Sequence, residues 1–345
     1  MKSSPGSPPR TRGRTGRSRA VPVAGAVLAL AGLLAGCHAG GSGSGSGGAG
    51  ASLTELTVAA TPGVADAPLY LAESQGLFAK AGLRVRIDSE TSATTELGQL
   101  AQGHADVATT DYADFFYAQS NDASLRIVAD GYDAAPGVME VLSLPGSGLT
   151  SPQQLVNRTV GTPEPQEFSY DPSVPYSLET MATQAVLLND GVEPNQVKWR
   201  PMPAQNLVGA LRSHKVDAIL VTEPYVYQAE AQLGAGEVLD SLSGGTASLP
   251  LDGYFTTAAF AHKYSGALDT FRSVLEQAQA EAAAGKDVRA ALASAARLSQ
   301  QTADMVTLGV YPTTLNVNGI QQLDEQMCNF GMLASPVSVS GMIAG

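Results

Sequence analysis

Hydroxyl and carboxyl side chains follow several apolar segments of this chain, and these groups can bind a small solute by hydrogen bonds without covalent chemistry. Such positions recur where a strand-like segment gives way to a helix-like one. The candidate ligand-binding residues are Asp66, Ala67, Pro68, Ser92, Thr94, Thr110, Asp111, Thr162, Glu164, Thr222, Glu223 and Tyr254. Their hydroxyls, together with free helix N–H groups, would suit a sulfonate or a carboxylate.

Helix capping explains many of the same residues. The typical N-cap types among them are Ser92, Thr94, Thr110 and Thr222. Asp66 precedes a predicted helix and could cap it. Glu223 is followed by a proline, and the alternative to ligand contact is that it complements a helix dipole. The sequence therefore leaves ligand contact and capping open for each residue, and the set carries more weight than any one member.

Catalytic motifs are missing from the sequence. The four histidines stand at positions 38, 104, 214 and 262, and there is no H-E-x-x-H, no G-x-S-x-G and no phosphate-binding P-loop. Since no nucleophile–base pair or metal-ligand set is visible, the sequence predicts a protein that is not an enzyme and has neither cofactor nor metal.

The segment from Asp66 to Asp88 indicates how such groups would be positioned. Pro68 falls in the first turn of a predicted helix, apolar residues recur at helical spacing to residue 80, and Ala81-Gly82 can end that helix. Residues 83–88 then alternate like a strand with one buried face. With the apolar TVAAT before it, the unit is strand, loop, helix and strand, and a ligand tends to bind where such a first strand meets its helix.

The same alternation continues along the chain. Strands are predicted near 105–110, 125–129, 138–144, 158–162, 196–200, 216–221 and 253–261, and helices near 94–102, 177–190, 204–213, 223–233, 267–308 and 319–332. Residues 145–148 (PGSG) would connect the first group of strands and helices, before residue 145, to the second group, after residue 148. This balance predicts an α/β fold with mainly parallel sheets.

The N-terminal region resembles a secretory signal. Residues 1–20 hold six basic and no acidic residues, and residues 21–36 are apolar but too short to span a bilayer comfortably. The run ends in Leu-Ala-Gly-Cys37, which resembles the bacterial lipobox and implies cleavage before Cys37 and acylation, as with palmitate, at its sulfur. The alternative is a small-residue cleavage site that happens to precede a cysteine. Without twin arginines, the general secretory route is expected.

Residues 38–53 are rich in glycine and serine and would form a tether of roughly 20–24 Å. The whole chain has 20 basic and 32 acidic residues, so loss of the six basic residues of the signal leaves 14 against 32, a net charge of −18. This balance excludes the basic face that nucleic acid needs, and leaves an acyl chain as the membrane attachment. With Cys37 acylated, Cys328 has no partner for a disulfide.

Four motifs in fixed order carry a family resemblance. They are APLYLAESQGLFAKAGLRVRI, QLAQGHADVAT, GLTSPQQLVNRTVGT and ALRSHKVDAILVTEPY. Together they resemble the solute-binding lipoproteins of ATP-driven importers in the nitrate, sulfonate, taurine and thiamine-precursor group, over nearly all of 54–335. The resemblance implies the two-lobed type II periplasmic-binding fold. Lobe one would be 54–145 plus 251–345 and lobe two 146–250, with ligand held in the cleft by hinge closure.

The resemblance also implies the protein's setting and partners. It would be a monomer held by lipid on the outer face of the bacterial cell membrane, capturing a small molecule for permease and ATPase subunits. One alternative is a sensing lipoprotein that signals by protein contact. Another is a pyrimidine-precursor enzyme of the same fold. Those enzymes have a cysteine-rich iron motif, and this motif is absent here.

One departure from the family bears on the ligand. After Gly161, sulfonate- and nitrate-type members tend to be rich in glycine and serine, which lets main-chain N–H groups approach an anion. Here the loop reads TPEPQEFSYDPSVPYS, with two glutamates and three aromatic residues. Unpaired carboxylates would repel an oxyanion, so the loop favours a neutral or cationic ring such as a pyrimidine over nitrate. The alternative is an exposed loop that never touches ligand.

Overall fold

The computed structural model describes residues 55–89, 95–121, 123–164, 177–285 and 287–345. All of them belong to one compact unit, Ala49–Gly345. The predicted signal, Cys37, the tether, Ser92, Thr94 and the loop 165–176 lie outside the described residues. No helix in the described ranges has the length and apolarity needed to cross a membrane.

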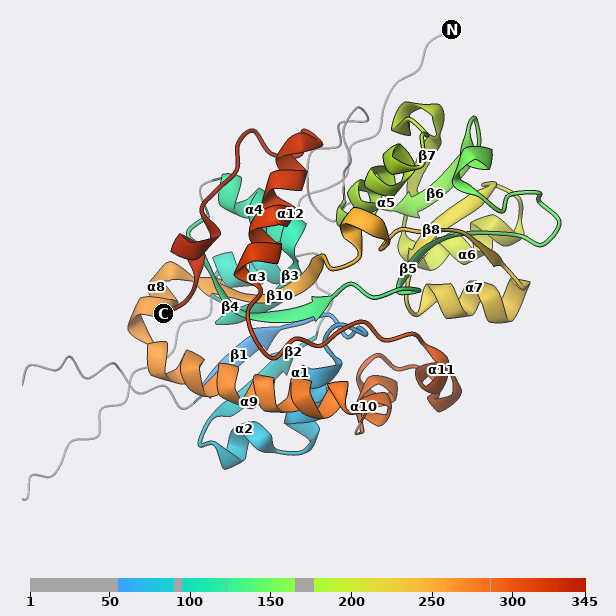
Figure 1. The fold of residues 1–345 in the computed structure, drawn as a ribbon. Helices are drawn as coiled ribbons and strands as arrows, with labels where there is room; N and C mark the ends of the chain where they lie inside the picture. The colour runs from blue at the N-terminus through green and yellow to red at the C-terminus, as the bar shows by residue number, and fades with distance from the viewer. Residues whose placement is uncertain (1–54, 90–94, 122, 165–176, 286) are drawn as a thin grey trace, which may run out of the picture. The chain divides into compact units, whose positions relative to one another are not determined.

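Two five-stranded sheets form the framework (Figure 1). Sheet A has the order β2-β1-β3-β10-β4, and sheet B has the order β7-β6-β8-β5-β9. In sheet A the strands are β1 (Glu55–Ala59), β2 (Arg84–Asp88), β3 (Val107–Asp111), β4 (Leu125–Asp133) and β10 (Pro250–Thr257). In sheet B they are β5 (Met139–Ser143), β6 (Thr159–Pro163), β7 (Lys198–Met202), β8 (Ala218–Thr222) and β9 (Gly236–Asp240).

Both sheets are mixed, so the prediction of mainly parallel sheets is wrong. β1 pairs in parallel with β2 and β3, and β6 pairs in parallel with β7 and β8. β10 and β5 instead run antiparallel to both of their neighbours. The reason is that each of these two strands enters directly from a strand of the other sheet, without the crossover helix that makes consecutive strands parallel.

The chain passes between the sheets at 134–138 and again at 241–249. The predicted passage at 145–148 therefore comes too late, because β5 already pairs with β8 and β9. The return near residue 250 agrees with the expected start of the returning strand. β9 has no counterpart among the predicted strands, since its short GEVLD sequence lacks an alternating pattern.

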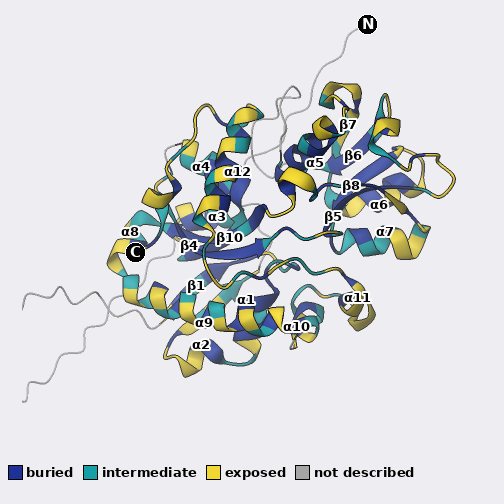
Figure 2. Ribbon diagram, viewed as in Figure 1, coloured by how far each residue is buried: buried dark blue, intermediate teal, exposed yellow. Residues whose placement is uncertain are grey.

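Helices cover the sheets (Figure 1). Those that follow or flank sheet A strands are α1 (Ala67–Ser74), α2 (Leu77–Lys80), α3 (Glu96–Ala101), α4 (Tyr112–Ser120), α8 (Ala258–Lys263), α9 (Ser265–Ala283), α10 (Val288–Ala295), α11 (Gln300–Met305) and α12 (Val317–Asn329). Those of the sheet B segment are α5 (Leu178–Asn189), α6 (Ala204–Arg212) and α7 (Tyr225–Leu233). Figure 2 shows buried strands and helices whose outer sides are exposed.

The helix predicted over 68–80 is divided into α1 and α2. Pro68 does occupy the first turn of α1, as the sequence predicts. Gly76, however, has a φ of +65°, in the left-handed region that an α-helix cannot contain. A second short turn, α2, then leads into β2, which pairs with β1 at the edge of sheet A.

An aromatic cluster fixes β10 against α4. The Phe115 ring stacks on Phe255 with centroids 4.5 Å apart, and Tyr112 meets Phe255 edge-on at 5.4 Å. All three side chains are fully buried. The Tyr112 hydroxyl donates a hydrogen bond to Asp130 of β4 at 3.0 Å, so the cluster joins α4 to two strands of sheet A, β10 and β4.

Gly253 in β10 is expected to be irreplaceable within this cluster. An added Cβ would lie 2.8 Å from Cζ of Phe255 and 2.9 Å from Cζ of Tyr112. Gly253→Ala should therefore lower the free energy of unfolding by about 1–3 kcal/mol. Gly209→Ala in α6 is the control, because its Cβ meets no atom within 4 Å, and it should stabilise by about 0.5–1 kcal/mol. Urea unfolding followed by circular dichroism measures both, and equal midpoints would contradict this packing.

Candidate functional site

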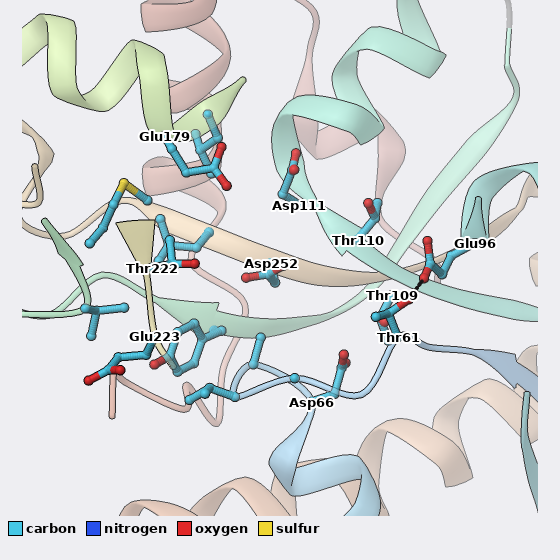
Figure 3. A pocket seen from close by; sticks show the side chains of 18 residues that line it. Thr61, Asp66, Glu96, Thr109, Thr110, Asp111, Glu179, Thr222, Glu223 and Asp252 are labelled. Atoms are coloured by element: carbon cyan, nitrogen blue, oxygen red, sulfur yellow. Dashed lines mark hydrogen bonds between the residues drawn. The ribbon is translucent and has the colours of Figure 1, made fainter. Parts of the chain in front are cut away.

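A cavity of about 260 Å³ is lined by residues from both sheets (Figure 3). The part of the chain that includes sheet A contributes Thr61, Gly63, Val64, Ala65, Asp66, Glu96, Thr109, Thr110, Asp111, Tyr132, Leu251 and Asp252. The part that includes sheet B contributes Val138, Met139, Leu178, Glu179, Thr222 and Glu223. The volume is below the range typical of drug-sized ligands, so it suits a small solute.

Strand ends position most of these groups. β1 and β3 are parallel, so the residues that follow them meet at one edge of sheet A. Asp66 lies in the loop after β1, immediately before α1, and Asp111 ends β3 and begins α4. Thr222 ends β8 and Glu223 follows it, at the corresponding edge of sheet B. The cavity is therefore at the strand-to-helix turns where the sequence predicts a ligand.

Five of the predicted ligand-binding residues line this cavity together. They are Asp66, Thr110, Asp111, Thr222 and Glu223. Capping and cavity lining turn out to be compatible: the Asp111 carboxylate accepts from the Asp114 N–H at 2.7 Å as the N-cap of α4, yet it also borders the cavity. Asp66 makes no side-chain capping bond to α1.

Five other predicted residues are described but are not part of the lining. Ala67 and Pro68 are buried in the first turn of α1, and Thr162 and Tyr254 are buried in β6 and β10. Glu164 is exposed just after β6. Ligand contact by these five stays a prediction, as it does for Ser92 and Thr94.

Acidic residues that the sequence reasoning missed complete the lining. Glu96 and Glu179 occupy the first turns of α3 and α5, whereas the predicted Glu223 candidate lies just before the N-cap of α7. Asp252 lies inside β10, where it interrupts the apolar first part of the strand. That interruption is a usable signal, because a carboxylate within a buried strand must face a polar partner or a cavity.

The lining is rich in acidic side chains. Six of its residues carry carboxylates: Asp66, Glu96, Asp111, Glu179, Glu223 and Asp252. No lysine, arginine or histidine is among the described residues that line it. Of the four undescribed internal stretches, 90–94, 122 and 165–176 contain none either, and the fourth is the single residue Lys286.

The six carboxylates differ in how far the protein itself satisfies them. Glu223 accepts from the N–H groups of Tyr227 at 3.1 Å and Thr307 at 2.7 Å. Glu96 accepts from the Thr61 hydroxyl (dashed in Figure 3). By contrast, no described residue donates a hydrogen bond to the Asp252 or Glu179 side chain.

Burial and like-charge repulsion raise the pKa of several of these acids. Burial, followed by the neighbouring Asp252, raises the pKa of Asp66 well above its usual range, while the Thr109 hydroxyl lowers it in part. Burial raises the pKa of Asp111 likewise, with Asp114 and Glu179 adding to the rise. For Asp252, burial and then Glu179, Asp114 and Asp130 raise the pKa to about 7.

The described part of the chain holds no group of three histidine, cysteine, aspartate or glutamate side chains close enough to bind a metal ion.

Two mixed sheets with a cavity lined from both define the two-lobed fold of periplasmic binding proteins. The chain belongs to the NMT1/THI5 like family, which it matches over residues 65–287. The predicted family and the predicted α/β fold are thereby confirmed. No curated protein matches the chain in sequence.

Solved structures share this fold at low sequence identity. The periplasmic aliphatic sulphonate binding protein SsuA from Escherichia coli has a TM-score of 0.68 and 16% identity, with 85% of this chain and 98% of SsuA covered. The periplasmic nitrate-binding protein NrtA from Synechocystis PCC 6803 has a TM-score of 0.64 and 13% identity, with 84% of each chain covered. The desulfurization enzyme DszB has a TM-score of 0.60 and 13% identity, with 85% of this chain and 96% of DszB covered.

The raised pKa of Asp252 predicts how the stability of the empty protein depends on pH. Asp252 has a higher pKa in the folded protein than in the unfolded chain, so folding tightens its hold on the proton. The resulting contribution to the free energy of unfolding is fully present at pH below 4 and is lost as pH rises through about 7. Asp252→Asn should remove that loss and raise the melting temperature at pH 8 by about 2–4 °C for each kcal/mol recovered. Thermal unfolding from pH 4 to 8 provides the measurement.

Asp269→Asn is the matched control, because Asp269 is an exposed residue of α9 that forms a surface ion pair with Arg272. This variant should keep the wild-type dependence on pH, since such pairs contribute little. A pH profile for Asp252→Asn that superimposes on wild type would contradict the burial of an uncompensated carboxylate at this position.

Proposed function

We propose that this protein is the extracytoplasmic solute-binding lipoprotein of an ABC importer, which captures a small organic solute and delivers it to a permease. The cavity lined from both sheets supports the proposal most directly, since strand-end turns facing one another across a cleft are what a solute-trapping protein needs. Family membership and the shared fold with SsuA and NrtA, a sulphonate- and a nitrate-binding protein, support the same role.

We further propose that each sheet forms one lobe. The two segments that pass between the sheets, 134–138 and 241–249, would then be the hinge about which the lobes close on ligand. The segment that contains Thr307 and Val310 makes a third, non-covalent connection. The Thr307 N–H donates a hydrogen bond to Glu223, which follows β8 of sheet B, and Val310 exchanges two backbone hydrogen bonds with Asp133, which ends β4 of sheet A. Closure would bring Glu179 and Thr222 nearer to Asp66 and Asp111 around the solute.

A binding role is favoured over an enzymatic one. DszB is a desulfurization enzyme with a similar fold, so the fold alone does not separate the two classes. The described lining residues, however, include no serine, cysteine or histidine to act as nucleophile. The four threonines and six carboxylates of the lining instead provide hydrogen-bonding groups for a bound solute.

Solute binding can be tested with a total small-molecule extract of yeast, and separately with defined sulfonates, taurine, nitrate, carboxylates and pyrimidines. A solute present at a hundred times its dissociation constant adds about 2.7 kcal/mol, which should raise the melting temperature by roughly 5–10 °C. The Asp269→Asn variant should show the same shift. Failure of the extract and of every defined compound to raise the melting temperature would contradict a solute-binding function.

Lipid anchoring at Cys37 has its own test. Cys37→Ser should move the expressed protein from the membrane fraction to the soluble fraction and remove the acyl mass from the intact protein, because the sulfur that carries the lipid is lost. Cys328→Ser is the matched control, since Cys328 is a free, partly buried thiol that should leave fractionation unchanged. Continued acylation of the Cys37→Ser protein would exclude the lipobox interpretation.

A further inference from the structure

The charge of the cavity points to the class of solute. We propose that the cavity binds a small organic cation, such as an amine or ammonium compound, through Asp66, Glu179 and Asp252. This inference rests on the proposed solute-binding function and names the ligand class of that same cavity. It rests on three observations: the unmatched charge, the state of the helix N-termini and the apolar part of the lining.

The unmatched charge comes first. Asp66 is only 9% exposed, and it projects into the cavity from the loop before α1. Asp252 enters from β10 and Glu179 from the first turn of α5, and no described residue donates a hydrogen bond to either side chain. Desolvated carboxylates without a countercharge are costly, and a bound cation would supply what the described lining lacks.

These carboxylates come from separate elements and border one space. Figure 3 shows Asp66, Asp111, Glu179 and Asp252 around the same opening, on a loop, a strand end, a helix and a strand of different parts of the chain. Their mutual repulsion is part of what raises the pKa of Asp66, Asp111 and Asp252. A cation placed between them would relieve that repulsion.

Carboxylates of the protein lie at the N-termini of three helices beside the cavity. In an anion site the free N–H groups and the positive end of the helix dipole attract the ligand. Here the first turns of α3, α4 and α5 already hold Glu96, Asp114 and Glu179, and Asp111 takes a free N–H of α4. These carboxylates would repel a sulfonate or nitrate at the three N-termini.

The rest of the lining suits an organic cation. Apolar side chains border the same space: Val64, Tyr132, Val138, Met139, Leu178 and Leu251. They can cover the hydrocarbon part of an amine. A bare metal ion would use none of this apolar surface.

The test separates the yeast extract by ion exchange into cationic, neutral and anionic fractions and measures the melting temperature of the full chain, purified in mild detergent, with each. A rise with the cationic fraction alone is expected. A rise confined to the neutral or anionic fraction would overturn the cation inference while keeping the solute-binding function. No rise with any fraction would count against both the cation inference and the solute-binding function.

Metal ions are the control for the organic part of the ligand. MgCl₂, CaCl₂ and ZnCl₂ are added separately, and a rise in melting temperature with one of them equal to that of the cationic fraction would overturn the inference that the ligand is organic.

Variants then assign the charge. Asp66→Asn and Asp252→Asn each keep the side-chain shape and should weaken binding of the active cationic fraction about tenfold or more, because a charge-assisted contact is lost. Asp269→Asn should bind like wild type. Full binding by both Asp66→Asn and Asp252→Asn, with unchanged folding by circular dichroism, would contradict the proposed contacts.

Discussion

A concentration of buried carboxylates without a countercharge is the constraint on which the account of this protein depends. Asp66, Asp111 and Asp252 would each prefer water or a positive partner, and the described lining of the cavity contains no positive side chain. Burial and like-charge repulsion raise the pKa values of all three. The protein accepts this cost in its empty state, and a cationic solute would remove it on binding.

The two-sheet architecture creates this arrangement. Parallel strands bring their ends to one edge, so that the turns after β1 and β3 deliver Asp66 and Asp111 to the same place. The antiparallel strand β10 then carries Asp252 between β3 and β4, directly beside them. Sheet B supplies Glu179 and Thr222 in the same way from α5 and β8. The two segments that pass between the sheets therefore determine the topology. β10, which follows the second of them, brings the Asp252 carboxyl to the cavity.

Much of the fold follows from local patterns in the sequence. The alternation of residues 83–88 and the place of Pro68 in the first turn of α1 are correctly predicted, because both depend on neighbouring residues only. The break at Gly76 and the antiparallel direction of β5 and β10 are not, since they depend on a left-handed residue and on long-range pairing. The site shows the same division. Asp66, Thr110, Asp111, Thr222 and Glu223 are found from their places at strand ends. Asp252 lies inside a strand, where the sequence marks it only as a carboxylate in an apolar run, and its place at the cavity follows from the pairing of β10 with β3.

The sign of proton exchange on binding tests the central claim most directly. Asp252, with a pKa of about 7, is partly protonated near neutral pH in the empty protein. A cation would favour its ionised form and release protons, and an anion would favour the neutral form and take protons up. Titration calorimetry of the active fraction at pH 6.5, in two buffers of different ionisation enthalpy, measures this exchange. The account predicts net proton release, and proton uptake or no exchange would contradict it.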